Sequence, residues 1–139
     1  MNRSIIYLLF VPALALTLIT GCLPGGDQPV LTGSSWKLIS YAGNQPLPET
    51  EITAEFEGDQ IRGSAGCNQY FGSYSARGEK LTVEQLAWTE MACLDPEGVM
   101  EQEQRVMALL SQADSYQISS NRLQITTSVG SDLIFESTD

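Results

Sequence analysis

Histidine is absent from the 139 residues of the sequence, and this absence excludes several classes of chemistry. A Ser–His–Asp triad and a zinc site with histidine ligands both need an imidazole ring. Basic residues are also few, since seven Lys and Arg face 17 Asp and Glu for a formal net charge of −10. Such an acidic chain repels nucleic acid phosphates and anionic lipid headgroups. We therefore expect no nucleic-acid partner and no histidine-based catalysis.

Motifs for cofactors and metals are missing as well. Gly63, Gly66 and Gly72 lack the lysine of a phosphate-binding P-loop, and close strand approach or positive φ explains them better. The acidic residues after Asp95 lack the alternating ligands of a calcium-binding loop. The sequence therefore predicts no bound metal and no cofactor.

Paired carboxylates are the form of catalysis that the composition leaves open. The candidates are Glu84, Glu90, Asp95 and Glu97. A glycan or lipid hydrolase of this kind needs two carboxyl groups that face each other across a cleft. Nothing in the spacing brings two of these residues together, so we expect a protein that is not an enzyme.

No apolar run reaches the roughly 20 residues that a transmembrane helix needs. The apolar stretch Ile5–Ile19 is shorter, contains Pro12 and follows a start that carries Arg3. These features favour an export signal over a permanent membrane span.

The end of this stretch, Ile19, Thr20, Gly21 and Cys22, resembles the lipobox of bacterial lipoproteins. The resemblance implies a signal peptide over residues 1–21 and acyl chains on Cys22, where each buried methylene contributes about 0.8 kcal/mol to anchoring. Leu23 follows in place of aspartate, as in Gram-negative outer-membrane lipoproteins. We expect a cell-envelope protein, lipid-anchored to the outer membrane and facing the periplasm. An ordinary leader with a different cleavage site is the alternative.

The mature chain divides into a tether and one domain. Residues 22–34 are rich in glycine and proline, so they predict a flexible tether after the lipidated cysteine. Residues 35–139 are sufficient for one folded domain. Its first strand is expected to place Trp36 and Leu38 on one face and Tyr41 on the other.

Alternation of apolar and polar residues is clearest from Glu51 to Glu57, which predicts a half-exposed strand. Gly58 and Asp59 predict a turn into a second arm over residues 60–65. Further short strands are expected over residues 35–41, 69–74, 80–83, 116–118, 123–127 and 132–136. The pattern predicts a mainly β (α+β) fold, a compact antiparallel meander or partly open barrel of about eight short strands.

One segment interrupts this series of strands. Asp95 and Pro96 have the character of an N-cap and a first helical residue. The apolar residues that follow have helical spacing: Val99, Met100, Val106, Met107, Leu109 and Leu110. We expect one amphipathic helix that covers a face or an end of the sheet.

Two segments with one cysteine each carry a family resemblance. The first holds the triplet Gly66, Cys67 and Asn68, followed by aromatic residues, and the second holds Thr89, Met91, Ala92 and Cys93. In this order and spacing, with Trp36 near the start of the domain, they resemble the META domain family, which includes the HslJ-like bacterial proteins.

The resemblance implies a compact, mostly antiparallel β domain with one helix, often exported or lipid-anchored. It implies links to stress tolerance, antibiotic tolerance and secretion, and no defined reaction. We therefore expect a non-enzymatic binding or stress-tolerance module of the cell envelope. Its expected partners are the membrane, through the lipid anchor, and an unknown envelope protein or small molecule. A protein inhibitor or assembly accessory is a further alternative.

Cys67 and Cys93 remain as a pair once Cys22 is assigned to lipidation. In an oxidising compartment a structural disulfide is favoured, and it would close a loop of about 27 residues. A redox pair lacks CxxC spacing and a nearby cation or histidine to activate a thiol. A buried pair without a bond is the other alternative.

Aromatic residues gather in the same region: Trp36, Tyr70, Phe71, Tyr74 and Trp88. The core of a small β domain needs such large side chains, so we expect them to be buried. If some are exposed together, they become the best candidates for an interaction surface.

Overall fold

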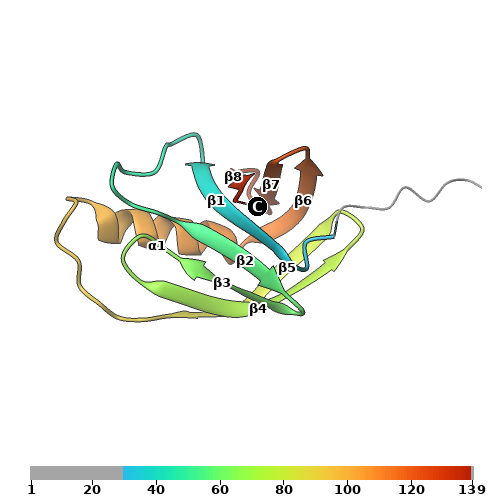
Figure 1. Cartoon of the computed structure of the whole chain (residues 1–139), viewed down its shortest axis with the longest axis horizontal. Coiled ribbons are helices and arrows are strands. Elements are labelled where there is room, and N and C mark those ends of the chain that lie inside the picture. Colours follow the sequence, from blue (N-terminus) through green and yellow to red (C-terminus); the bar gives the residue numbers. More distant parts are fainter. Residues whose placement is uncertain (1–29, 139) are drawn as a thin grey trace, which may run out of the picture.

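The computed structural model describes residues 30–138 and shows eight antiparallel strands that close into a barrel, with one helix (Figure 1). The predicted mainly β fold is confirmed, and the barrel is closed. The predicted signal peptide, Cys22 and most of the predicted tether lie outside the described residues. The elements are β1 (Ser34–Tyr41), β2 (Thr53–Glu57), β3 (Gln60–Ser64), β4 (Gln69–Arg77), β5 (Lys80–Trp88), α1 (Val99–Leu110), β6 (Ala113–Ser119), β7 (Arg122–Thr127) and β8 (Asp132–Ser137).

The hairpin of β2 and β3 follows directly from the sequence pattern. Ile52, Ala54 and Phe56 are at most 2% exposed, as the alternation predicts. Gly58 turns the chain with a φ of 60°, which glycine adopts without steric cost. On the outer face Arg62 forms ion pairs with carboxylates of β2, and pairs this exposed contribute little to stability.

Strand β1 differs from the expected alternation at its end. Trp36 and Leu38 lie in the core, but Tyr41, expected on the opposite face, is also buried, at 6% exposure. The pairing with β8 shifts between Leu38 and Ser40, which is the signature of a β-bulge. An extra residue on one strand reverses the inward and outward alternation, so Tyr41 turns to the core.

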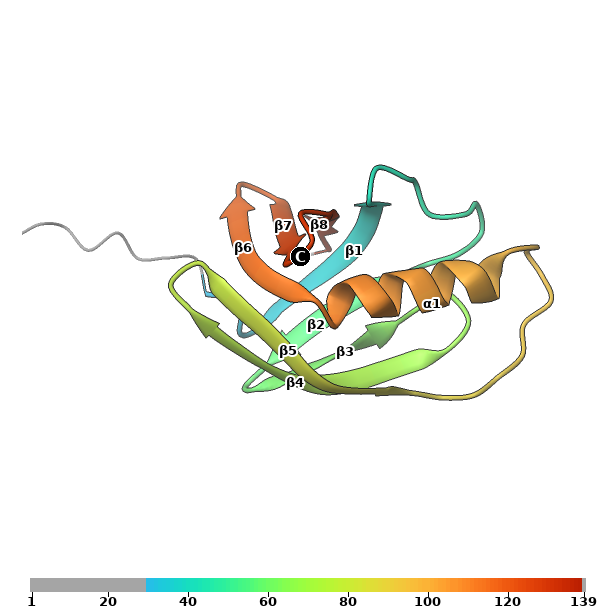
Figure 2. The same ribbon diagram turned by 180° about the vertical axis from the view of Figure 1, so that it is seen from behind.

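The barrel closes through seams of unequal length. β1 pairs with both β2 and β8, whereas β5 and β6 are joined by a single residue pair, Lys80 with Ser115. Figure 2 shows α1 running into the start of β6, across the region where β5 and β6 separate. The helix therefore lies beside the part of the barrel that strand pairing leaves open, with a hollow between it and β5.

Helix α1 begins later than the sequence predicts. The N-cap is Gly98, with no side-chain capping bond, so the assignment of Asp95 as N-cap and Pro96 as first residue is wrong. Instead the amide of Val99 donates to the carbonyl of Pro96, which forms a turn before the helix. An Asp-Pro pair suits a turn as well as a helix start, which explains the error. Val106, Met107 and Leu110 pack into the core as expected. No helix in residues 30–138 has the length and apolarity to cross a membrane.

The folded domain includes residues that the sequence analysis assigned to the tether. Leu31 is 1% exposed and belongs to the core, and Gly33 donates a backbone hydrogen bond to Phe56. Composition alone did not reveal this, because one leucine among glycine, proline and polar residues carries no periodicity. The folded domain therefore includes Leu31.

Replacement of Leu31 tests this boundary. We expect Leu31→Ala to lower the free energy of unfolding by about 2–5 kcal/mol, because a buried side chain is truncated. Val30→Ala is the matched control, since Val30 is 73% exposed and its loss should cost less than about 0.5 kcal/mol. Urea unfolding measures both, and equal small effects would contradict the assignment of Leu31 to the core.

Tyr70 places a hydroxyl inside the barrel. Its side chain is 2% exposed, and its hydroxyl donates to the carbonyl of Thr53 at 2.7 Å. Burial, with a smaller contribution from the negative charge of Glu55, raises the pKa of Tyr70 above its ordinary value. The folded state therefore holds the phenolic proton more tightly than the unfolded state does.

This shift predicts a loss of stability in alkali. The contribution of Tyr70 is fully present below the unfolded tyrosine pKa of about 10 and declines as the pH rises above it. At pH 8 Tyr70→Phe should be about 1 kcal/mol less stable than the native protein, because the hydrogen bond is lost. The difference in unfolding free energy should shrink in urea unfolding at pH 11. A constant difference would refute the raised pKa of Tyr70 in the folded state.

Candidate functional site

The two motif segments of the sequence meet at one end of the barrel. Gly66–Asn68 connects β3 to β4, and Thr89–Cys93 follows β5 on the way to α1. A disulfide joins Cys67 to Cys93, with Cα atoms 6.0 Å apart and a sequence separation of 26. Closure of a loop of this length lowers the conformational entropy of the unfolded chain and so raises its free energy by roughly 3 kcal/mol. The expected disulfide is therefore present.

Asn68 holds the second motif segment in place. Its side chain is 1% exposed, and its Oδ1 accepts hydrogen bonds from the Thr89 hydroxyl and the Met91 amide, both at 2.7 Å. Its Nδ2 donates to the Met91 carbonyl at 3.1 Å and to Glu103 Oε1 at 2.7 Å. These bonds use all four hydrogen-bonding positions of the amide. The sequence singled out Asn68 for its family motif, and the structure gives it this clamping role.

Glu103 is the partner that the sequence analysis missed. It lies on the inner face of α1 at 2% exposure, and its Oε2 accepts from the backbone amide of Asn68 at 2.7 Å. Both carboxylate oxygens are therefore engaged by one residue. The sequence did contain a signal for this contact, because a charged residue stands at position 103 on the helix face that carries Val99, Val106 and Leu110.

Gln102 ties a second loop to the same helix. Its Oε1 accepts from the backbone amide of Leu47 at 2.6 Å, and its Nε2 donates to the Thr50 hydroxyl at 3.1 Å. Gly66 passes close by with a φ of 111°, where an added Cβ would lie 3.4 Å from Gln102 Nε2. The motif glycine thus supplies a backbone conformation that other residues rarely adopt.

The aromatic residues divide between core and surface. Trp36, Tyr70 and Tyr74 are buried as expected, but Phe71 is 57% and Trp88 43% exposed. The expectation of burial is therefore wrong for the last two. Phe71 lies between buried Tyr70 and Gly72 in β4, so it is on the outer face. Trp88 lies at the end of β5, next to Thr89–Cys93, which we call the motif loop.

Two hollows meet along β5 and α1. One, of about 460 Å³, is lined by Gln85, Leu86, Trp88, Gln104, Met107, Ala108 and Ser111. The other, of about 310 Å³, is lined by Asn68, Trp88, Thr89, Glu90, Met91, Ala92, Met100, Glu103 and Gln104. Because Trp88 and Gln104 line both, the hollows adjoin, and we call the two together the β5–α1 groove.

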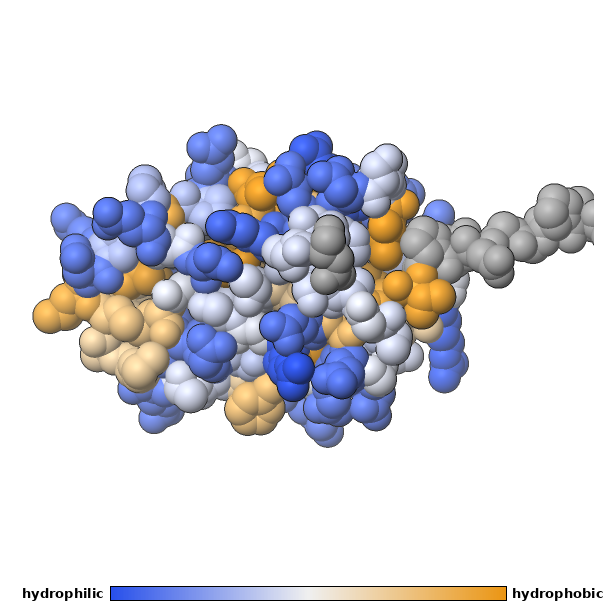
Figure 3. Space-filling model, viewed as in Figure 1, coloured by the Kyte–Doolittle hydropathy of each residue, from blue (hydrophilic) through white to orange (hydrophobic). Residues whose placement is uncertain are grey.

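The surface near this groove is apolar at its outer end. Met91 is 53% and Leu94 is 91% exposed. In Figure 3 orange residues lie beside blue ones at the end of the molecule opposite the N-terminal segment. Exposed side chains of this kind are typical of interaction surfaces.

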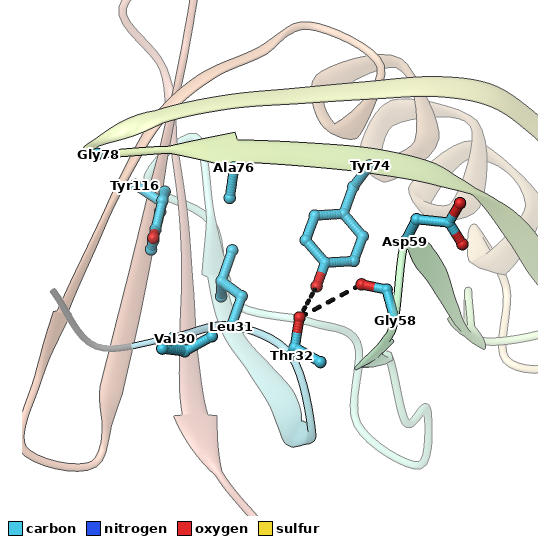
Figure 4. Close-up of a pocket in the computed structure, with 9 residues that line it drawn as sticks. All are labelled: Val30, Leu31, Thr32, Gly58, Asp59, Tyr74, Ala76, Gly78 and Tyr116. Atoms are coloured by element: carbon cyan, nitrogen blue, oxygen red, sulfur yellow. Dashed lines mark hydrogen bonds between the residues drawn. The ribbon is translucent and has the colours of Figure 1, made fainter.

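Another pocket lies at the opposite end of the barrel (Figure 4). It measures about 330 Å³ and is lined in part by Val30, Leu31 and Tyr116. Thr32 closes one side through hydrogen bonds with the Tyr74 hydroxyl at 2.7 Å and the Gly58 carbonyl at 3.3 Å. Its lining contains one carboxylate, Asp59. This pocket therefore offers no carboxylate pair.

The acidic residues considered for catalysis are not brought together in a cleft. Glu84, Glu90, Asp95 and Glu97 are all exposed, and Glu90 alone among them lines the β5–α1 groove. Within residues 30–138, no group of three His, Cys, Asp or Glu side chains is arranged to hold a metal ion.

Comparison with known proteins identifies the family. The sequence profile of the META domain matches residues 29–139. The chain belongs to the META domain family. A comparison with curated proteins finds no match, so the narrower HslJ-like assignment gains no support from a named relative.

Solved structures share the fold of this META domain. An NMR structure of a protein from Burkholderia xenovorans is 27% identical with a TM-score of 0.66, over 78% of this chain and 83% of that one. A second NMR structure is 23% identical with a TM-score of 0.61, over 76% and 90%. A DUF4847 family protein from Bacteroides vulgatus is 13% identical with a TM-score of 0.56, over 77% and 94%, and these last two show the fold alone.

Replacement of Glu103 tests the clamp of this META domain. Glu103→Gln should lower the free energy of unfolding by about 1–3 kcal/mol, because an amide presents only one acceptor oxygen to the two donors of Asn68. Glu101→Gln, on the exposed face of the same helix, should change it by less than about 0.5 kcal/mol. Urea unfolding separates these outcomes, and two equal effects would show that the buried carboxylate does not stabilise the fold.

Proposed function

We propose that the protein is a non-enzymatic lipoprotein of the cell envelope that binds another envelope protein through the β5–α1 groove. The observation that carries the proposal is that polar and apolar side chains at the motif loop have different surroundings. The polar groups of Asn68 and Glu103 are used inside the fold, whereas Trp88, Met91 and Leu94 present apolar surface to solvent. Such a surface is suited to contact and not to bond-breaking chemistry.

The loop is also prepared for binding. A segment held by a disulfide and by side-chain hydrogen bonds loses little conformational entropy when a partner docks. Tryptophan is among the residues that contribute most to protein interfaces, and methionine adapts its shape to a partner. Trp88, Met91 and Met100 supply both kinds of side chain to the groove.

A carboxylate-based hydrolase has less support. The groove is lined by two carboxylates, Glu90 and Glu103, and the second has both oxygens in hydrogen bonds to Asn68. A hydrolase of this kind needs both carboxyl groups available to its substrate. We therefore favour binding, in which an inhibitor or assembly role would use the same surface.

The proposed anchor suits this arrangement. If acyl chains on Cys22 hold the N-terminal end at the membrane, the motif loop lies at the far end of the domain (Figure 1). The groove would then face away from the lipid surface and towards soluble or peptidoglycan-associated partners.

Photo-crosslinking in living cells tests the binding site. A photoreactive amino acid at Met91 should give one discrete crosslinked product with an envelope protein. Val129 is the matched control, since it is also exposed, at 67%, but lies in the turn between β7 and β8. Absence of a product at Met91, or the same product from Val129, would contradict the proposed site.

The anchor needs a separate measurement. The intact mass of the membrane-purified protein should correspond to cleavage before Cys22 plus acyl groups, and Cys22→Ser should appear without acyl mass in the soluble fraction. A native protein that keeps its leader and lacks acyl mass would refute the lipoprotein assignment.

A further inference from the structure

Strand β5 has an edge without a strand beside it. It pairs with β4 from Lys80 with Arg77 to Trp88 with Tyr70, with one register shift at Gln85, whose φ is 55°. Its pairing with β6 is limited to Lys80, so within residues 30–138 the segment Leu81–Trp88 has a strand neighbour on one side only. Backbone amides and carbonyls of such an edge can pair with an added peptide strand.

The β5–α1 groove lies along this same edge. Leu86 and Trp88 come from β5, and Met107 and Ala108 come from α1. Figure 2 shows that β5 and α1 border the region where the barrel seam is open. A peptide strand on the β5 edge would therefore place alternate side chains in an apolar groove, because successive side chains point to opposite faces.

The charges around the groove indicate what kind of peptide fits. Lys37, Arg62, Lys80 and Arg122 are each used in an ion pair, and Arg77 lines a different hollow, together with Lys80 and Glu84.

The described lining of the groove contains no Lys or Arg. Its two carboxylates are Glu103, which is hydrogen-bonded to Asn68, and Glu90, which is exposed and forms no ion pair with any other described residue. A groove that has Glu90 and no cation in its lining, on a chain of net charge −10, attracts positive charge and repels anionic lipid.

We propose that the β5–α1 groove binds an extended segment of a partner protein that is both basic and apolar and that adds as a strand to the edge of β5. This inference rests on the proposed binding function and names the chemistry of its partner. An acyl chain would also suit the apolar lining, but it would leave the hydrogen-bonding groups of the strand edge unpaired and would not use the negative charge of Glu90.

A defined peptide tests the proposal on the mature protein. The probe is a peptide of about eight residues, the length of a strand, in which lysine and leucine alternate. Its matched control has glutamate in place of lysine. Trp88 is 43% exposed and Trp36 only 4%, so tryptophan fluorescence reports on the groove, and Trp88→Phe removes the signal. The lysine peptide should bind at least about tenfold more tightly than the glutamate peptide.

Variants locate the binding site. Ala108→Arg fills the groove from an exposed helix position and opposes a basic peptide, so it should weaken binding at least about tenfold. Ala76→Arg, also exposed but at the other end of the barrel, should leave binding unchanged. Amides of Leu81–Trp88 should become protected from hydrogen exchange when the lysine peptide binds. Circular dichroism verifies that both variants fold.

Each other outcome overturns the inference in a distinct way. Equal binding of the two peptides would refute charge selection, and protection confined to α1 would refute strand addition. A Trp88 response to phosphatidylglycerol vesicles but not to either peptide would assign the groove to lipid. If neither peptide binds while Met91 still crosslinks in cells, the partner chemistry is wrong and the binding function stands. If crosslinking fails as well, both are wrong.

Discussion

One buried side chain, Asn68, connects three parts of the chain that the barrel strands alone would leave separate. Its amide and backbone bind Glu103 on α1 and Met91 in the loop after β5, while its neighbour Cys67 is bonded to Cys93. Because an unpaired buried carboxylate is costly, the Glu103 contact fixes where α1 can lie. The position of α1 in turn sets one wall of the β5–α1 groove, and the held loop sets its end. The motif residues therefore set the shape of the proposed binding site.

Local patterns in the sequence were sufficient for most of the barrel. All eight strands and the helix were expected near their observed positions, because alternation, helical spacing and turn residues are local signals. The errors lie where longer-range pairing decides the outcome. The bulge that turns Tyr41 inward depends on the register with β8, and the late start of α1 at Gly98 depends on how the loop before it turns. The burial of Leu31 likewise depends on contacts across the barrel.

The sequence identified some residues of the candidate site and missed others. Asn68, Cys67 and Cys93 were identified through the META resemblance, and the disulfide joins the expected pair. Glu103 and Gln102 were missed, because their partners lie 35 or more residues away in the chain. The groove was also missed, since it results from the short seam between β5 and β6, which no single segment encodes. Trp88, at the end of β5, was expected in the core and is instead a surface residue.

Hydrogen exchange at the Met91 amide tests the role of Asn68 most directly. The Met91 side chain is 53% exposed and lies outside any strand, yet its amide donates to Asn68 Oδ1 at 2.7 Å. If the clamp holds the loop, this amide should exchange about as slowly as amides of the barrel core and become fast in Asn68→Ala. Exchange in the native protein as fast as that of the Val129 amide, in an exposed turn, would contradict the account.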